Sequence, residues 1–239
     1  MKKRNFKPLL VASGILSAIS ILGLILILGI QLPAFGMWFY YWQYDANDTY
    51  AQVAMMPEHL HDVTRHMIEY MRGRTPDLQI YTMVDGEMRP FFSDIEIRHM
   101  VDVMVLARIM FIVRNVLAVL AVVSLVPFAL LRWERRDGQI IFLKCWKWVS
   151  GGIFAALAIL AGIIAINWHR AWWVFHEIFF SNDYWILDPR VDLLINIVPY
   201  PFFLTMSIFI GAFFALGLVL MFVISAILLR RRYKSASYW

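Results

Sequence analysis

Four long apolar stretches constrain the fold of this 239-residue chain more than any other feature of its sequence. They cover residues 9–32, about 111–131, about 148–168 and about 202–229. Each is near or above the roughly 20 apolar residues that a helix needs to cross a bilayer. Hydrophobic residues make up 61% of the chain, which exceeds the usual share of about 45–50% in soluble domains. We therefore predict an all-α membrane protein with four transmembrane helices.

Basic residues gather at the two ends of the chain and between the second and third apolar stretches. They are Lys2, Lys3, Arg4, Lys7, Arg132, Arg135, Arg136, Lys144, Lys147, Arg230, Arg231, Arg232 and Lys234. Cytoplasmic loops of membrane proteins carry an excess of lysine and arginine. This pattern predicts that both termini are cytoplasmic and that two loops face outward. The net charge of +5 then reflects topology, so we expect no binding to nucleic acid.

The chain divides into segments by composition. We predict a cytoplasmic N-terminus with the first membrane helix (1–32), a small extracytoplasmic α+β domain (33–93), a second helix that protrudes outside and crosses from about residue 111 (94–131), a cytoplasmic loop (132–147), a third helix with an outer extension (148–176), an outer loop (177–201), a fourth helix (202–229) and a cytoplasmic tail (230–239).

The predicted outer domain contains signals for a helix and a hairpin. Leu60, Val63 and Met67 recur at helical spacing within the segment PEHLHDVTRHMIEYMRGR, which indicates an amphipathic helix. Asp85-Gly86 interrupts the alternating segment QIYTMVDGEMRPF, a pattern typical of a hairpin with a type I′ turn. The segment 33–93 is therefore expected to be ordered and not a linker.

Ser93 and Glu96 have the spacing of a capping box, so a helix is expected to start there. At about 1.5 Å per residue, His99 lies about 50 Å along that helix from Arg132, and His176 lies about 42 Å from Trp148 if the third helix is continuous. The hydrocarbon core is only about 30 Å thick. We therefore predict that both histidines lie at a similar level outside the outer membrane boundary, where they form one site.

Polar residues accompany both histidines. Glu96 and Asp102 flank His99 at three-residue spacing, and a carboxylate there would orient the ring as a general base. A solvated helix face at the membrane entrance explains the same pattern equally well. His176 is followed by Asn182 and Asp183, which suit a second acid–base group or simply the polar end of a helix.

Candidate substrate-binding residues lie near the histidines in sequence. Arg108 and Arg114 would hold a phosphate or an ester carbonyl, or extend to the interface as lipid-facing arginines do. Asp188 would bind a substrate amine or only solvate the loop, and Trp185 would contact substrate or order the same loop. These alternatives stay open at the level of sequence.

Several familiar chemistries have no motif in this chain. It lacks a G-x-S-x-G elbow, a P-loop, a dinucleotide fingerprint and an H-E-x-x-H motif. Cys145 is the only cysteine, so no internal disulfide forms. We expect no metal and no cofactor. A pair of histidines without an enzyme nucleophile suits a reaction whose substrate carries its own nucleophile.

Two blocks of this sequence resemble the lipoprotein intramolecular transacylase (Lit) family. They are DGEMRPFFSDIEIRHMVDVMVL, residues 85–106, and FHEIFFSNDYWILDPRVDLLINIVPYPFF, residues 175–203. The resemblance implies an enzyme that moves the sn-2 acyl chain of a diacylglyceryl-cysteine to the α-amino group of the same cysteine. The two functional histidines of the family would correspond to His99 and His176. The family more often has a basic residue where Ile95 and Met104 stand here.

The resemblance also implies partners and a location. Diacylglyceryl-modified bacterial lipoproteins and membrane lipid would be the partners, the protein would be a monomer, and its site would face outward from the bacterial cytoplasmic membrane. His99 would be the general base, oriented by Glu96 or Asp102, and His176 the oxyanion stabiliser or proton donor, although the roles could be exchanged. The alternatives are a histidine-dependent lipid acyl hydrolase and a non-enzymatic accessory or sensor protein with four spans.

Overall fold

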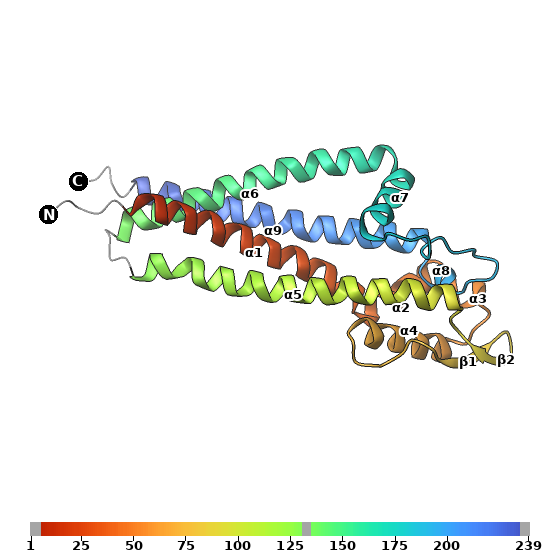
Figure 1. Ribbon diagram of the computed structural model, residues 1–239. Helices are drawn as coiled ribbons and strands as arrows, with labels where there is room; N and C mark the ends of the chain where they lie inside the picture. Colours follow the sequence, from red (N-terminus) through yellow and green to blue (C-terminus); the bar gives the residue numbers. More distant parts are fainter. Residues whose placement is uncertain (1–5, 131–134, 235–239) are drawn as a thin grey trace. The chain divides into compact units, whose positions relative to one another are not determined.

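The computed structural model describes residues 6–130 and 135–234, which are mostly helical (Figure 1). The helices are α1 (Lys7–Ala34), α2 (Met37–Ala46), α3 (Thr49–Gln52), α4 (Pro57–Met71), α5 (Asp94–Leu130), α6 (Arg135–Ile166), α7 (Trp168–Phe179), α8 (Leu194–Ile197) and α9 (Tyr200–Lys234), with strands β1 (Tyr81–Val84) and β2 (Glu87–Pro90). Within the described residues α1, α5, α9 and the part of α6 from Asp137 are long and apolar enough to cross a membrane. The predicted cytoplasmic residues Lys2, Lys3, Arg4 and Arg132 lie outside the residues that the structure describes.

The third predicted helix is interrupted, so the continuous helix considered for residues 148–176 does not form. Helix α6 ends at Ile166 and α7 begins at Trp168. Asn167 between them has φ −149° and ψ 83°, and its side chain accepts a hydrogen bond from the Arg170 N–H. Asparagine at this position satisfies one of the unpaired N–H groups at the start of a helix, which makes a break favourable. In addition, α6 already begins at Arg135, so most of the predicted loop 132–147 is helical.

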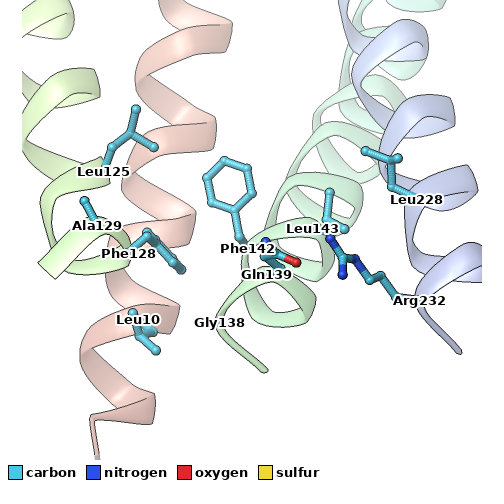
Figure 2. A pocket seen from close by; sticks show the side chains of 10 residues that line it. All are labelled: Leu10, Leu125, Phe128, Ala129, Gly138, Gln139, Phe142, Leu143, Leu228 and Arg232. Atoms are coloured by element: carbon cyan, nitrogen blue, oxygen red, sulfur yellow. The ribbon is translucent and has the colours of Figure 1, made fainter. Parts of the chain in front are cut away.

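One of two compact units comprises Met1–Leu28, Val113–Ile166 and Gly211–Trp239. Its buried core consists of Ala18, Leu22, Phe214, Leu218 and Met221. Small residues bring its helices close together, since a Cβ atom built on Gly217 would lie only 2.8 Å from Cγ2 of Ile25. This unit also contains a mainly apolar cavity of about 530 Å³. Figure 2 shows the residues that line it: Leu10, Leu125, Phe128, Ala129, Gly138, Gln139, Phe142, Leu143, Leu228 and Arg232.

The second unit comprises Gly29–Ile112 and Asn167–Ile210. Its core brings together buried side chains from distant segments, among them Tyr44, Leu60, Phe91, Met100 and Phe202. Residues 33–93 therefore do not form a domain with a core of their own, because α5, α8 and α9 complete that core. This second unit also contains both candidate histidines.

The local signals within residues 57–96 are confirmed. Helix α4 begins at Pro57 and buries the predicted apolar stripe, including Leu60 and Val63. Strands β1 and β2 are antiparallel, with Val84 opposite Glu87. Asp85 and Gly86 have φ values of 51° and 78°, as a type I′ turn requires at both central positions. Helix α5 begins directly after Ser93, as the capping box predicts.

A buried hydrogen bond between α2 and α4 provides a test of this core. The Thr64 hydroxyl donates to the Leu60 carbonyl, so the Tyr44 hydroxyl donates to Oγ1 of Thr64, at 2.7 Å. We expect Tyr44→Phe to lower the free energy of unfolding by about 1 kcal/mol, because one buried hydrogen bond is lost. Thermal unfolding in detergent measures this change. The matched Tyr81→Phe, at a position that is 68% exposed, should have no effect, and equal melting of both variants would contradict the prediction.

Candidate functional site

Helices α5 and α7 place one histidine each in the same site. The ring centroids of His99 and His176 lie 6.4 Å apart with an interplanar angle of 34°. Phe180 contacts both, with its ring centroid 5.2 Å from that of His99 and 5.6 Å from that of His176. The structure thus brings together the two residues that the sequence singled out, although they are far apart in the chain.

The hydrogen bonding of His176 determines which ring nitrogen carries its hydrogen. Nδ1 lies 2.8 Å from the backbone carbonyl oxygen of Trp172. A carbonyl oxygen only accepts, so Nδ1 must donate, and Nε2 of the neutral ring keeps its lone pair. His176 is only 5% exposed, and burial lowers the pKa of its imidazole from the ordinary value of 6.5, against the raising effect of the Trp172 carbonyl. The arrangement suits a neutral ring that accepts a proton at Nε2.

Aromatic side chains surround His176. The indole of Trp185 stacks on the imidazole, with centroids 4.6 Å apart and an interplanar angle of 26°. Trp172 lies 4.3 Å away, centroid to centroid, at 57°, and Trp173 supports Trp185 edge-on at 4.8 Å. Trp185, expected to bind substrate or order the loop, is therefore a direct neighbour of a candidate catalytic ring.

His99 is partly buried, and its Nδ1 is buried without a hydrogen-bond partner among the described residues. The carboxylates expected to orient it are directed elsewhere. Glu96 accepts hydrogen bonds from the backbone N–H groups of Ser93 and Leu194, and Asp102 accepts one from Nδ2 of Asn182 at 2.9 Å. Side chains on a helix point toward its N-terminus, so Glu96 closes the capping box at Ser93 and does not reach His99.

These contacts anchor the segment 181–194, which we call the site loop, to the start of α5. Asn182 is held by Asp102 near one end of the loop. Near the other end, Ser93 donates to Oδ1 of Asp192 at 2.9 Å, and Glu96 accepts from Leu194. Glu96 is fully buried and Asp192 is 5% exposed. The pairing of Ser93 with Asp192 joins residues 99 positions apart, and no motif in the sequence indicates it.

The remaining predicted residues lie away from this pair of rings or on the surface. Asp183 and Arg108 are exposed. Asp188 forms a surface ion pair with Arg190, whose hydrogen bonds lower the pKa of that carboxyl to about 2. Arg114 belongs to the other compact unit and donates to Oδ1 of Asn115. Within residues 6–130 and 135–234, no group of three or more histidine, cysteine or acidic side chains could hold a metal ion.

Comparisons with known proteins agree with the fold. The family model described as lipoprotein intramolecular transacylase Lit matches residues 15–203. The solved structure of the membrane integral lipoprotein intramolecular transacylase Lit from Bacillus cereus has a TM-score of 0.71 and 22% identity, covering 93% of this chain and 97% of that chain.

Two variant structures of that Bacillus cereus protein also match. The variant with a histidine replaced by arginine has a TM-score of 0.65 and 23% identity, covering 94% of this chain and 93% of that chain. The variant with a histidine replaced by alanine has a TM-score of 0.66 and 22% identity, covering 93% and 94%. The comparison with curated proteins gives no match.

Glu96→Gln tests the anchoring of the site loop. Both carboxylate oxygens accept backbone N–H groups, and an amide offers only one acceptor oxygen. We expect the free energy of unfolding to fall by about 1–3 kcal/mol, the usual cost of a buried polar group without a partner. Thermal unfolding measures the loss, and hydrogen exchange at the Leu194 amide should become faster. The exposed Glu177→Gln serves as the control, and unchanged exchange in Glu96→Gln would contradict the anchoring.

The lowered pKa of His176 predicts how stability depends on pH. Below its ordinary pKa of 6.5, the unfolded chain binds a proton at this residue that the folded chain does not bind. Stability is therefore complete above that value and falls as the pH falls through the window below it. We expect the unfolding temperature to drop as the pH falls below 6.5, and His176→Gln to reduce this drop. The exposed His169→Gln should keep the wild-type slope; identical slopes in all three proteins would refute the prediction.

Proposed function

This chain belongs to the lipoprotein intramolecular transacylase Lit family, and from this premise we propose that it converts diacylglyceryl-modified lipoproteins to the N-acyl lyso-form. The sn-2 acyl chain of the diacylglyceryl-cysteine would move to the α-amino group of the same cysteine. The protein is a multi-pass membrane protein, and we propose that its site faces outward, where lipid-modified N-termini are found. No cofactor takes part in this scheme.

The hydrogen bond from Nδ1 of His176 to the Trp172 carbonyl carries the proposal. It leaves the lone pair on Nε2, so His176 is the better general base of the pair. The α-amino group of a lipoprotein has an ordinary pKa of about 7.7–8, so the protonated fraction must first release its extra proton to solvent before the amine can attack. A neutral imidazole within the site then takes a second proton, from the attacking amine nitrogen, as attack proceeds.

His99 takes the complementary role in this proposal. Its Nδ1 is buried without a partner among the described residues, and buried N–H groups without an acceptor are rare. The hydrogen of the neutral ring therefore belongs on Nε2, where it can donate to the oxyanion that forms from the ester carbonyl. This assignment exchanges the roles of His99 and His176 relative to the first interpretation of the sequence.

The reaction then proceeds without an enzyme nucleophile. The amine nitrogen attacks the ester carbonyl carbon while Nε2 of His176 takes a proton from it. The tetrahedral intermediate collapses, the bond to the sn-2 oxygen breaks, and His176 returns the proton to that oxygen. An amide and a free hydroxyl result, and no atom is gained or lost. Amine and ester belong to one molecule, so the main task of the protein is to hold them in attack geometry.

Replacement of either histidine should stop the conversion. Mass spectrometry of lipoprotein N-termini, from cells that lack other N-acylating enzymes, would detect N-acyl lyso-forms when the intact protein is present. We expect His176→Gln to lose at least about 100-fold in rate, as for removal of a general base, and His99→Gln to lose a similar factor by removal of an oxyanion donor. Both variants should accumulate at normal levels in the membrane.

His169→Gln is the matched control, since His169 is exposed on the same helix α7 and contacts Trp173 and Tyr200. It should retain full conversion. Release of free fatty acid in place of N-acylation would instead support a lipid acyl hydrolase. N-termini that are identical with and without the protein would refute the proposed function and favour an accessory or sensor role.

A further inference from the structure

The proposed base His176 lacks a carboxylate partner among the described residues. Its Nδ1 faces the Trp172 carbonyl, and three acidic side chains of α5 and the site loop are engaged elsewhere. Glu96 binds the backbone at Ser93 and Leu194, Asp102 binds Asn182, and Asp192 binds Ser93 and the Asp188 N–H. An imidazolium at this buried position therefore needs stabilisation from another direction.

That stabilisation can come from the aromatic side chain that lies against the face of the His176 ring. Trp185 stacks on it nearly parallel, at 26° and 4.6 Å between centroids. The face of an indole carries negative electrostatic potential, and it attracts a cation within about 6 Å of the ring centroid, most strongly where water is excluded. His176 is almost completely buried, so this attraction is not screened by solvent.

We propose that the indole of Trp185 stabilises the imidazolium form of His176 through its π face and so sets the proton affinity of this ring. Trp185 is then a positioning residue for the base. The consequence for acyl transfer rests on the proposed function, whereas the effect on proton affinity can be measured independently. The substrate-binding role first considered for Trp185 is not part of this inference.

The fold holds Trp185 in this position from several directions. Trp173 packs edge-on against its indole. The site loop that carries it is anchored to α5 by Asn182 at one end and by Asp192 at the other. The indole of Trp185 must stay stacked on the imidazole of His176 in both its neutral and its protonated form. A loop that is anchored at both ends keeps the indole in that position.

Other titratable groups lie on the elements that pack around His176. They include His99 and Asp102 on α5, with Glu96 and Arg98 on the same helix, Tyr184 and Asp183 on the site loop, Tyr200 on α9 and the neighbouring Glu177 on α7. His99 is in ring contact with His176, so a positive charge on one opposes protonation of the other. The experiment therefore includes a His99→Gln background, in which only one ring of the pair titrates.

Fluorinated tryptophans at position 185 separate electrostatics from packing. Each added fluorine weakens the π face with little change in shape, so the loop should remain folded. Protonation of His176 is followed by NMR of protein with ¹⁵N-labelled histidine in lipid nanodiscs, and the His176→Gln spectrum identifies its signals. We expect stepwise loss of proton affinity with fluorine number, about tenfold for the most fluorinated indole. The same series at Trp42, which is 50% exposed and contacts Phe39, is the control.

Two results decide the matter. A graded fall in proton affinity at position 185, absent at position 42, supports the inference in both the wild-type and His99→Gln backgrounds. Proton affinity that does not depend on fluorination overturns it. Acyl transfer by the same samples is a separate reading: if NMR shows the graded response but no N-acyl lipoprotein forms, the proposed function fails while the stacking effect stands. If transfer occurs and its rate–pH profile moves to lower pH with fluorination, the indole also sets the working range of the base.

Discussion

The buried carboxylate of Glu96 connects the two chain segments that form the site. One of its oxygens accepts the N–H of Ser93 at the start of α5, and the other accepts the N–H of Leu194, 98 residues further along the chain. A charged group without water is tolerated only when its acceptors are satisfied. The two backbone N–H groups are the hydrogen-bond donors that this carboxylate needs. Burial of Glu96 and docking of the site loop on α5 therefore depend on each other.

The anchored site loop completes the arrangement around the two histidines. Helix α5 presents His99, the short helix α7 presents His176, and the site loop returns to α5 with Trp185 stacked on His176. The break at Asn167 lets α7 begin with its own cap. The site therefore depends on a helix end, a loop and a long helix that share one core, and not on a single motif.

The chemistry of the site differs from that of hydrolases with a serine nucleophile and a carboxylate behind the histidine. In this chain a backbone carbonyl takes the position of the carboxylate at Nδ1 of His176, and the indole of Trp185 stacks on the ring, where we propose that it takes over the role of the missing charge. Such an environment keeps the ring neutral at rest, as the lowered pKa of His176 indicates. Aromatic side chains form most of the surroundings of this ring, among them Trp172, Phe180 and Trp185.

Features that depend on neighbours along the chain could be predicted from the order of the residues alone. Apolar length predicted the four long helices, Ser93 and Glu96 predicted the start of α5, and Asp85-Gly86 predicted the hairpin, because helix caps and tight turns are set within a few residues. The sequence also singled out His99 and His176, through counted helix lengths and family resemblance. The cap at Asn167 was readable in principle, but the apolar run through it favoured a continuous helix.

The partners that these residues use became known only from the folded chain. Spacing along α5 suggested that Glu96 or Asp102 orients His99. In the fold, Glu96 instead accepts a hydrogen bond from the Leu194 N–H, and Asp102 accepts one from Asn182. The tautomer of His176, its stacking on Trp185 and the burial of Asp192 likewise arise from contacts between segments far apart in the chain. Hydrogen-bonding groups satisfy the nearest available partner when water is excluded, and which partner is nearest is a property of the packed chain and not of the order of its residues.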